Sequence, residues 1–541
     1  MNIQLSESKD SIHVMCGYDQ KDMMKSIDGY KWNPKRMSWD FPLSRLPDIC
    51  DIFKVELSGD VKSILDEETE KRRLVESKID LCKKLRSGEV DPQTVMPWIP
   101  DYLFTHQKIA LACASQFDSF ALFMEPGTGK TATTIELIKR RGVDTLVVAP
   151  LSILESVWMA QLAQYAPGLT ARNLWRANGM GSRSDYCQVE VVNYQKFKKL
   201  PLMYLQERFG MIVFDESSAL RAHNTQTTKA AIKASSIIPH RLILTGTPFP
   251  NSPIELWGQM NCINPSLLGN NFYQFRNRYF KMVGFGNFLP VCSSINKNII
   301  MNRVGRQAVF YKKEECVDLP EKIFQERFVQ MDDQQTTAYK QMEKENILNF
   351  ASNTALAANQ LVEIMKLRQI ASGFVIGTDG NSIKISDTKI TELKAVLQEL
   401  GEEQVIIWCC FHWEIKTIRD ILKEKSGCLY GEESQSDKEE TIERFKAGSI
   451  QFLIAHPRSA GHGLNFTNAS YAIYFSLDYS FEAFIQSQDR IHRIGQKNKC
   501  TYILLLAKGT IDEIVYKALT KKEGMMDAML AMLRGKRNER A

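Results

Sequence analysis

A glycine-rich segment in the first third of the chain has the residue types that bind phosphate. Met124 to Thr131 reads MEPGTGKT; it follows a short apolar run and precedes a segment with a helical pattern. Gly127 and Gly129 allow the backbone to curl so that N–H groups and the helix N-terminus face anionic oxygens. Lys130 then reaches the terminal phosphates, and the Thr131 hydroxyl completes the shell of a magnesium ion. The strict pattern has glycine in place of the methionine, and a purely structural glycine turn is the alternative interpretation.

An acidic pair follows the apolar run MIVF. Asp215 and Glu216 stand at the carboxyl end of this predicted buried strand, and ligands collect at that edge of an open parallel sheet. Asp215 is suited to hold magnesium, while Glu216 can accept a proton from the water that attacks a γ-phosphate. Taken alone, such a pair is usually a solvated strand end. Its position after a phosphate-binding loop favours nucleotide hydrolysis.

Two arginines lie in the last fifth of the chain, in the segment QSQDRIHRIGQ. Gln486, Arg490 and Arg493 are separated by four and three residues, which predicts one face of a helix. Arginine supplies the planar positive charge that stabilises phosphoryl transfer. We expect both arginines to project together toward nucleotide phosphates, with a surface helix and ordinary ion pairs as the alternative.

The elements that position these residues form two series. Short apolar runs alternate with helical segments from about residue 96: SFALF, TLVVA, VEVV, MIVF and RLIL. A second series starts near residue 404 with QVIIW, FLIA, YAIYF and YILLL. This rhythm predicts an α/β protein with two parallel-sheet lobes, because strands covered on both faces are apolar throughout. We expect an accessory domain and connecting helix at 1–95, lobe one at 96–260, helical insertions and a hinge at 261–385, and lobe two at 386–541.

The composition is that of an ordinary globular protein. The chain has 541 residues, of which 44% are hydrophobic and 24% charged. We find no apolar stretch of the ~18 residues that a membrane helix needs and no leader-like start, so we expect a cytoplasmic protein. The 12 cysteines show no C-x-x-C pair and are interpreted as reduced thiols. A net charge of +6 is too mild to establish a polyanionic partner. The basic cluster RGKRNER near the C-terminus is either a solvated tail or a phosphate contact.

The order of motifs resembles helicase superfamily two, and within it the Swi/Snf-type ATPases that translocate on double-stranded DNA. The resemblance covers roughly residues 100 to 530. The motifs that carry it, in chain order, are LFTHQ, EPGTGKT, VVAPLSILESVW, VVNYQ, DESS, LTGTPFPN, DLPEK, LRQIASG, SAGHGLN, QSQDRIHRIGQ and GTIDE. The strings R-I-G-Q and L-T-G-T-P-x-x-N are particularly specific to the Swi/Snf-type group. The lobes are then expected to be RecA-like, with ATP and Mg²⁺ as cofactors and double-stranded or branched DNA as partner.

The resemblance also implies roles for single residues. Gln107 would read adenine, and Arg490 with Arg493 would reach the γ-phosphate. The expected nucleotide-binding set is Gln107, Gly127, Thr128, Gly129, Lys130, Thr131, Asp215, Gly463 and Gln486, with Thr131 and Asp215 at the metal and Lys130, Glu216, Arg490 and Arg493 catalytic. The expected DNA contacts are Ser152, Asn193, Tyr194, Thr245, Gly246, Thr247, Ser459 and Asn465. Contacts to phosphate carry little base information, so we expect a motor nearly indifferent to DNA sequence.

Some positions differ from the residues that are usual in the family's motifs. Ser217 and Ser218 stand where superfamily two often has Ala-His, so the ATP and DNA sites are expected to be coupled differently here. His462 replaces a more common small or acidic residue, in wording that resembles compact bacteriophage-encoded members, which would place the protein in a bacterial or phage-infected cell. A core or surface histidine is the alternative for His462. His106, beside the adenine-reading glutamine, is interpreted as packing rather than as a base.

The N-terminal segment contains two tryptophans, Trp32 and Trp39, with Pro34 and Pro42. It resembles the small HARP-like module of annealing-helicase and fork-remodelling relatives. The alternative is that these aromatics form the core of a small domain, and both can hold.

The leading hypothesis is a monomeric, ATP-hydrolysing translocase on double-stranded DNA that remodels or reanneals branched DNA. Three alternatives stay open: a strand-separating DNA or RNA helicase, a duplex-tracking motor that displaces bound proteins, and a nucleotide-gated scaffold without turnover. The intact Lys130, Glu216 and Arg493 argue against the scaffold.

Overall fold

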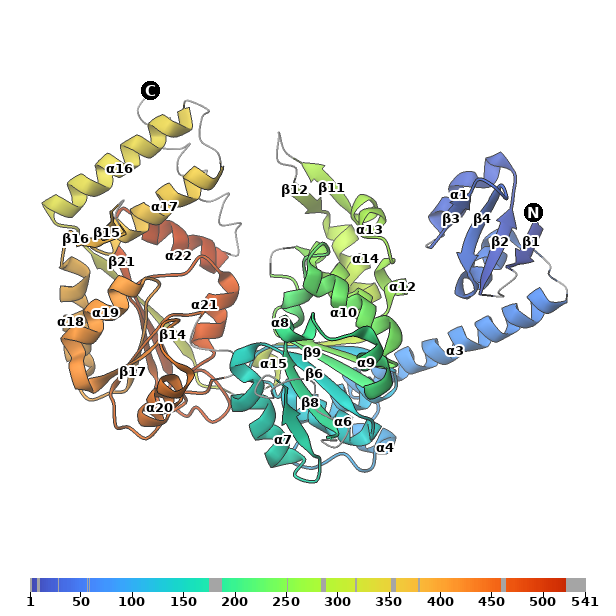
Figure 1. The fold of residues 1–541 in the computed structure, drawn as a ribbon, viewed down its shortest axis with the longest axis horizontal. Coiled ribbons are helices and arrows are strands. Elements are labelled where there is room, and N and C mark those ends of the chain that lie inside the picture. Colours follow the sequence, from blue (N-terminus) through green and yellow to red (C-terminus); the bar gives the residue numbers. More distant parts are fainter. Residues whose placement is uncertain are drawn as a thin grey trace. The chain divides into compact units, whose positions relative to one another are not determined.

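The chain divides into two compact units, Met1–Cys316 and Val317–Ala541, and each contains one parallel sheet (Figure 1). The computed structural model describes residues 2–6, 10–27, 29–55, 57, 59–174, 187–250, 252–283, 289–316, 319–351, 357–377, 380–458 and 464–521. Among these residues, none of the helices combines the length and the apolar character that crossing a lipid bilayer requires.

The first unit begins with a small antiparallel sheet in the order β1-β2-β4-β3. Its elements are β1 (Asn2–Leu5), β2 (Ser11–Met15), α1 (Lys21–Ser26), β3 (Lys31–Asn33), β4 (Ser38–Pro42) and α2 (Leu46–Phe53). Trp39 is 6% exposed and belongs to the core of this domain, whereas Trp32 is 44% exposed. The two rings lie 4.9 Å apart. The core interpretation therefore holds for Trp39, while Trp32 presents part of its ring to solvent.

A helix of 28 residues, α3 (Asp60–Ser87), follows this domain, as the charged helical pattern predicts. It ends at Gly88, whose φ of 80° is a left-handed conformation that glycine adopts without strain. Near its N-terminal end, Val61 and Leu65 pack against the core of the small domain. In its last turns, Ile79, Cys82 and Leu85 are buried in the core of the first parallel sheet. The C-terminal end of α3 is thus part of that core.

The first parallel sheet has seven strands in the order β13-β5-β10-β9-β6-β8-β7, with every pairing parallel. The strands are β5 (Ser119–Met124), β6 (Thr145–Ala149), β7 (Ala171–Asn173), β8 (Val189–Asn193), β9 (Met211–Asp215), β10 (His240–Thr245) and β13 (Ala308–Tyr311). All five apolar runs of the first series are strands. Two strands were not predicted: β7 is too short for a pattern, and β13 follows a long helical insertion.

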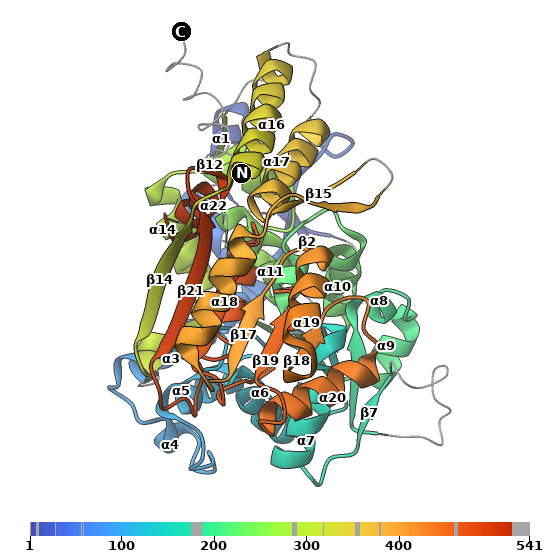
Figure 2. The ribbon, with the colours of Figure 1, turned by 90° about the vertical axis from the view of Figure 1, so that its left-hand side faces the viewer.

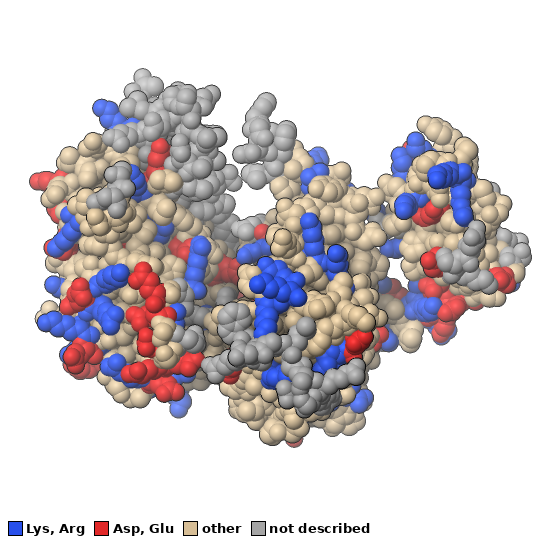
Figure 3. All heavy atoms as spheres, in the orientation of Figure 1, with Lys and Arg blue, Asp and Glu red and all other residues tan. Residues whose placement is uncertain are grey.

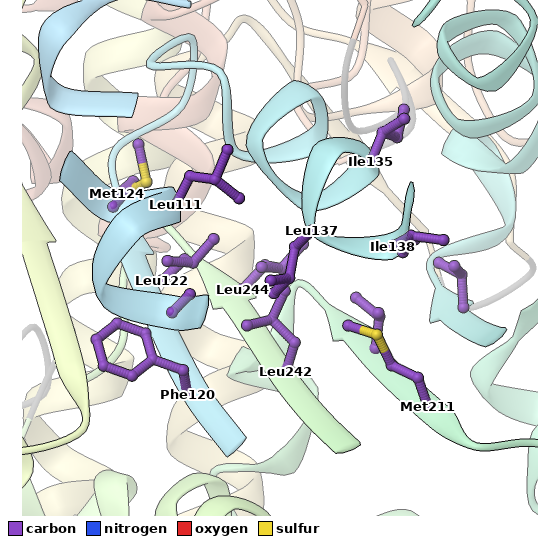
Figure 4. Packing of buried hydrophobic residues seen from close by; sticks show 14 of the residues in the cluster. Leu111, Phe120, Leu122, Met124, Ile135, Leu137, Ile138, Met211, Leu242 and Leu244 are labelled. Carbon is purple, nitrogen blue, oxygen red and sulfur yellow. The ribbon is translucent and has the colours of Figure 1, made fainter. Parts of the chain in front are cut away.

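Helices cover both faces of this sheet because alternate strand residues point in opposite directions. On one face, Leu111, Ile135 and Leu137 pack against Leu122, Met124 and Leu244 (Figure 4). On the other, Ala121, Phe123 and Ile243 pack against buried residues of α10 and α11. The helices of this unit are α4 (Pro92–Val95), α5 (Thr105–Ser115), α6 (Lys130–Arg141), α7 (Ala160–Tyr165), α8 (Tyr194–Phe197), α9 (Leu202–Arg208), α10 (Gln226–Ile237) and α11 (Leu256–Ile263).

An insertion separates β10 from β13. It comprises α12 (Pro265–Leu268), α13 (Phe272–Tyr279), the antiparallel hairpin β11 (Phe280–Val283) and β12 (Leu289–Cys292), and α14 (Ser294–Val304). A short α15 (Lys313–Cys316) ends the unit. The glycine-rich piece GFGNF at 284–288 lies outside the described residues.

The second unit contains a six-stranded sheet in the order β14-β21-β20-β17-β19-β18, again parallel throughout (Figure 2). Its strands are β14 (Lys322–Val329), β17 (Val405–Trp408), β18 (Ser426–Leu429), β19 (Phe452–Ala455), β20 (Tyr471–Tyr474) and β21 (Cys500–Ala507). The four predicted runs are strands, whereas β14 and β18 were not predicted. The edge strand β14 has no continuous apolar run, since Phe324 and Phe328 are exposed among polar residues.

The long helical pattern at 336–370 is two helices, α16 (Asp333–Ala351) and α17 (Ala357–Ala371). The small hairpin β15 (Phe374–Ile376) and β16 (Ser382–Lys384) follows. The remaining helices are α18 (Thr388–Leu400), α19 (His412–Leu422), α20 (Gln435–Lys446), α21 (Phe481–Gln488) and α22 (Ile511–Lys521). The predicted fold class, α/β with two parallel sheets, helical insertions and a small N-terminal domain, is confirmed.

Candidate nucleotide site

The phosphate-binding segment forms the strand–loop–helix turn that its sequence predicts. The strand β5 ends at Met124, and α6 begins at Lys130. Gly127 and Gly129 have φ values of 84° and 89°, in the left-handed region that glycine tolerates. A Cβ atom at Gly129 would lie 2.0 Å from Nε2 of Gln107. Glycine is therefore required at this position both for its backbone conformation and for the close approach of Gln107.

Gln107 and His106 hold the loop from the side of α5. Gln107 Nε2 donates to the carbonyl oxygen of Thr128 at 2.9 Å, and its Oε1 accepts the N–H of Phe104 at 3.1 Å. The ring of His106 contacts the same Thr128 carbonyl through Nε2 at 2.8 Å. Burial lowers the pKa of His106, so the neutral ring donates this bond. His106 packs the loop, in agreement with its interpretation from the sequence.

Lys130 lies against the loop that it is expected to serve. Its Nζ donates to the carbonyl oxygens of Met124 at 2.8 Å and Glu125 at 3.4 Å. These partners are neutral backbone groups, which a phosphate oxygen would outcompete because its negative charge adds direct attraction to the ammonium. Thr131 follows in the first turn of α6, and Thr128 is fixed by a 2.7 Å bond from its hydroxyl to the carbonyl of Glu125.

Asp215 is the last residue of β9 and is 5% exposed. Its Oδ2 accepts the indole N–H of Trp158 at 2.8 Å, and its Oδ1 accepts the backbone N–H of Glu216 at 2.9 Å. Burial, and then the charge of Glu216, raise the pKa of Asp215 to about 6; the charge of Lys130 and the Trp158 bond act in the opposite direction. A buried carboxylate with its pKa raised in this way gains most from a bound cation.

Glu216 adopts a φ of 50°, an uncommon conformation for a residue with a side chain. Its Oε2 lies 3.5 Å from the hydroxyl of Thr245, at the end of the neighbouring strand β10. The carboxyl ends of β5, β9 and β10 therefore bring together the phosphate loop, the acidic pair and the first residue of the TGTP segment. This is the arrangement that the order of motifs predicts.

Oxygen donors at this edge suit magnesium. The Thr131 hydroxyl and the Asp215 carboxylate are hard ligands, and Mg²⁺ in nucleotide sites takes one or two protein oxygens with the rest of its shell from phosphates and water. The raised pKa of the desolvated Asp215 is consistent with a place for a cation. The residues present fit the ion, and binding it would help to neutralise charge on the phosphates.

The segment after β10 touches the phosphate loop directly. A Cβ atom on Gly246 would lie 2.6 Å from Cδ of Pro126, so only glycine allows this approach. Thr245 is fully buried, and its hydroxyl accepts the N–H of Thr247 at 3.2 Å. Of the three expected DNA-binding positions, Gly246 thus packs against the phosphate loop and Thr245 approaches Glu216, while Thr247 bonds Thr245.

The other expected DNA contacts of the first unit have structural partners. Asn193 is 5% exposed and caps α8 by accepting the N–H of Lys196 at 2.9 Å. The Tyr194 hydroxyl donates to the backbone carbonyl of Asp215 at 2.8 Å. Ser152 lies in a 3₁₀ turn at Leu151–Ile153, and its carbonyl accepts the hydroxyl of Ser156. Tyr194 therefore touches the acidic pair, while the DNA-binding roles of all three stay predictions.

In the second unit, Arg490 and Arg493 converge as predicted but not on a helix. The helix α21 ends at Gln488, and both arginines lie in the turns that follow. Tertiary bonds fix these turns: the side chain of Gln496 donates to the carbonyls of Thr467, Ala469 and Ile491. The predicted single helix face is wrong for this reason. Both guanidinium groups nevertheless donate to one carbonyl, that of Leu464, at 3.3 and 3.1 Å.

The remaining predicted positions of this unit are placed only in part. Gln486 lies on α21 and its amide contacts Glu482 at 3.4 Å. Asn465 accepts the N–H of Thr467 at 3.3 Å. Ser459, His462 and Gly463, with the basic cluster at 534–540, lie outside the described residues.

Two residues at the site were not singled out by the sequence analysis. Trp158 is fully buried and bonds Asp215, and it comes from a π-helical segment at Leu154–Met159. The sequence could have indicated Trp158, because it is the last residue of the motif VVAPLSILESVW. Gln259 on α11 accepts a 2.8 Å bond from the hydroxyl of Ser217. No local pattern marks Gln259, because every residue of α11 is buried.

Two domain families match the chain. The SNF2-related domain matches residues 29–373, and the helicase conserved C-terminal domain matches residues 388–495. Protein p41 of Acyrthosiphon pisum secondary endosymbiont phage 1 is 27% identical over 76% of this chain and 94% of its own. A Caenorhabditis elegans homologue of SWI/SNF-related matrix-associated actin-dependent regulator of chromatin subfamily A-like protein 1 is 23% identical over 93% of this chain and 71% of its own.

The chain is also similar to a longer helicase and to a solved structure. The chain spans 40% of the length of an ATP-dependent helicase of Mycoplasma genitalium, at 25% identity. A solved structure, the SWI2/SNF2 ATPase core of Sulfolobus solfataricus in complex with double-stranded DNA, is 24% identical over 77% of this chain and 90% of its own, with a TM-score of 0.38. Because the SNF2-related domain alone matches more than half of the residues, the chain belongs to that family, and it is a Swi/Snf-type, ATP-hydrolysing enzyme of helicase superfamily two.

Proposed function

We propose that this ATPase is a motor that moves along double-stranded DNA, uses Mg²⁺ with ATP, and acts on branched DNA. One observation carries the proposal. The segment Thr245–Thr247, where the family resemblance implies DNA backbone contacts, packs against Pro126 of the phosphate loop and approaches Glu216. A strand of DNA that displaces this segment therefore acts on the group expected to activate water.

The charge on one face of the first unit is consistent with a polyanionic partner. Lys and Arg side chains gather over the part of the chain labelled α8 and α10, with few Asp or Glu among them (Figure 3). Lys199, Lys229 and Lys233 are exposed residues of this part. Contacts of this kind neutralise phosphates without reading bases. The proposed motor is therefore nearly indifferent to DNA sequence, and its DNA affinity falls with salt.

The proposed chemistry uses residues at the carboxyl edge of the first sheet together with two arginines of the second unit. Lys130 exchanges its backbone partners for phosphate oxygens, Thr131 and Asp215 hold the metal, and Glu216 accepts the proton of the attacking water. Arg490 and Arg493, which share the Leu464 carbonyl, are proposed to stabilise charge on the transferred phosphate. Repeated cycles of hydrolysis then drive the movement along the duplex.

The experiment that tests this function is an ATPase assay of the purified chain without nucleic acid and with duplex DNA, forked DNA, single-stranded DNA or RNA. We expect strong stimulation by duplex or forked DNA and none in Lys130→Ala or Glu216→Gln. Preferential stimulation by RNA or single strands would contradict the duplex assignment. Displacement of a triplex-forming third strand, without release of a strand from a duplex, separates tracking from unwinding.

The preference for branched DNA is proposed to lie in the N-terminal domain. Because the end of α3 belongs to the first core, a sharp truncation removes residues 1–57 and keeps that helix. We expect the truncated chain to keep its duplex-stimulated ATPase and lose its preference for forks. A matched variant, Trp32→Ala, removes the half-exposed ring and leaves the buried Trp39 in place. An unchanged fork preference in both would contradict this assignment.

A further inference from the structure

A buried glutamine connects two loops of the nucleotide site. Gln259 lies on α11 and is fully buried. Its Oε1 accepts the hydroxyl of Ser217 at 2.8 Å, and its Nε2 donates to the carbonyl oxygen of Pro248 at 2.6 Å and to that of Glu255 at 3.1 Å. A single amide thus bonds one loop with its oxygen and another with its nitrogen.

The two loops are the ones whose movements need to be coupled in a motor. Ser217 directly follows Glu216, and Pro248 directly follows Thr247. One direct contact between these loops, from Thr245 to Glu216, is 3.5 Å long, at the weak limit for a hydroxyl bond. The two bonds through Gln259 are shorter. The bond from Ser217 is buried and the bond to Pro248 is partly buried, and a hydrogen bond away from water is electrostatically stronger.

The helix that carries the amide is held firmly against the loop of Ser217. A Cβ atom on Gly258 would lie 2.2 Å from the carbonyl oxygen of Leu220, in the 3₁₀ turn at Ser217–Leu220. Leu256, Met260 and Leu220 belong to one hydrophobic core. Because α11 and this turn are packed without space between them, a displacement of Pro248 would be transmitted to Ser217 through the amide of Gln259.

We propose that Gln259 is a positioning residue that couples the Thr245–Pro248 segment to Glu216, and that the Ser217–Gln259–Pro248 relay is required for DNA to stimulate ATP hydrolysis. This inference rests on the proposed function. It also gives a use to Ser217, which stands where superfamily two often has alanine and which has the hydroxyl that the relay needs.

The test compares four variants of the full chain: Gln259→Leu, Ser217→Ala, the double variant, and Asn261→Leu. Asn261 is the matched control, because it is a buried amide on the same helix whose Nδ2 donates to the carbonyls of Trp257 and Gly269 and to neither loop. Each protein is assayed for kcat and KM for ATP with and without duplex DNA, and for thermal unfolding.

We expect Gln259→Leu and Ser217→Ala to lower the ratio of DNA-stimulated to basal kcat about tenfold, within the usual range of coupling between sites. The change should appear in kcat with duplex rather than in the KM for ATP. The double variant, which removes both polar groups, should recover stability relative to Gln259→Leu but not stimulation. Asn261→Leu should lose stability and keep the wild-type ratio.

The outcomes separate the relay from the function on which it rests. A wild-type chain that no nucleic acid stimulates overturns the proposed function and the relay together. A stimulated wild type with an equally stimulated Gln259→Leu overturns the relay alone. Recovery of stimulation along with stability in the double variant would show that the glutamine is only a structural support.

Discussion

The carboxyl edges of the two parallel sheets contain the same kinds of residue with different partners. At the first edge, Lys130 bonds backbone carbonyls of its own loop, and the indole N–H of Trp158 is committed to a carboxylate. At the second, Lys389 bonds the carboxylate of Asp512 at 2.7 Å and the carbonyl of Phe475. Glu414 there accepts the N–H groups of Cys410 and Phe411 and the hydroxyl of Ser476 through one oxygen.

This difference in partners distinguishes an edge that can bind an anion from an edge that stabilises the fold. A lysine that bonds neutral carbonyls can exchange these bonds when an anion arrives, whereas a lysine paired to a buried carboxylate cannot do so without leaving a charge unpaired. Both lysines, and both glutamates, belong to α/β edges of similar topology. Matched substitutions in the two sheets therefore test which edge does the chemistry.

The largest contrast is expected between Glu216→Gln and Glu414→Gln, the same change at each edge. Glu216→Gln should lower the DNA-stimulated kcat by about 10²–10⁴, as the loss of a general base does, while nucleotide binding persists. Glu414→Gln should leave kcat within about twofold, because an amide oxygen can accept the same bonds. Steady-state ATPase and binding of a fluorescent ATP analogue measure the two effects. Similar losses of kcat in both variants would remove the contrast.

The substitution Lys389→Met should lower the stability of the fold more than the matching substitution Lys130→Met. The substitution leaves Asp512, in the first turn of α22, buried without its cation, a change that costs about 3–5 kcal/mol. Unfolding in urea should show this loss, and the double variant Lys389→Met/Asp512→Asn should recover part of it. Lys130→Met should lose nucleotide binding with a much smaller change in stability. An unfolding midpoint unchanged by Lys389→Met would refute the structural assignment.

Two fully buried tryptophans allow a comparison with a smaller expected effect, which isolates a single hydrogen bond. The indole of Trp158 donates to Asp215, whereas Nε1 of Trp408, at the end of β17, has no hydrogen-bond partner among the residues that the structure describes. Phenylalanine at either position removes similar volume, but only Trp158→Phe removes a bond to a charged group. We expect its kcat/KM for ATP to fall about tenfold, which is about 1.4 kcal/mol, with little change in Trp408→Phe.

Both tryptophan variants should lose some stability from the smaller ring, and thermal unfolding measures that common part. The metal requirement provides a second readout. The Mg²⁺ concentration needed for half-maximal binding of the fluorescent ATP analogue should rise in Trp158→Phe and stay constant in Trp408→Phe. An equal rise in the two variants would mean that ring volume, and not the hydrogen bond, matters.

Local motifs were predicted well because their geometry is local. Lys130 and Asp215 lie where the sequence places them, since a strand, a glycine loop and a helix are contiguous in the chain, and a strand end is visible as the end of an apolar run. Arg490 was misplaced on a helix because bonds from Gln496 to distant carbonyls override the helical spacing. Gln259 was missed because its partners lie 42 and 11 residues away and its helix has no polar face. The strand β14 was missed because pairing with β21, rather than an apolar run, makes it a strand.

An effect similar in size to that of the tryptophan substitution concerns the free energy of keeping Asp215 ionised without a metal. Its pKa of about 6 in the folded chain lies above the ordinary 3.8, so between pH 4 and pH 6 the folded state binds more protons than the unfolded state. Wild-type stability therefore falls as pH rises through that window and stays lower above it. Asp215→Asn removes the charge but also one acceptor for the bonds from Trp158 and Glu216.

The gain from removing the buried charge should exceed the loss of the acceptor. Without metal at pH 7.5, Asp215→Asn should therefore be more stable than wild type by on the order of 1–2 kcal/mol. The advantage should largely disappear near pH 4, where the carboxyl of the folded wild type is protonated and that of the unfolded chain is partly protonated. Thermal unfolding at the two pH values, in chelator and without nucleotide, measures it. Glu414→Gln is the control, since its edge is not expected to gain a cation. A destabilised Asp215→Asn at pH 7.5 would mean that the Trp158 and Glu216 bonds already offset the burial of the charge, and that this edge, like the second one, is built for support.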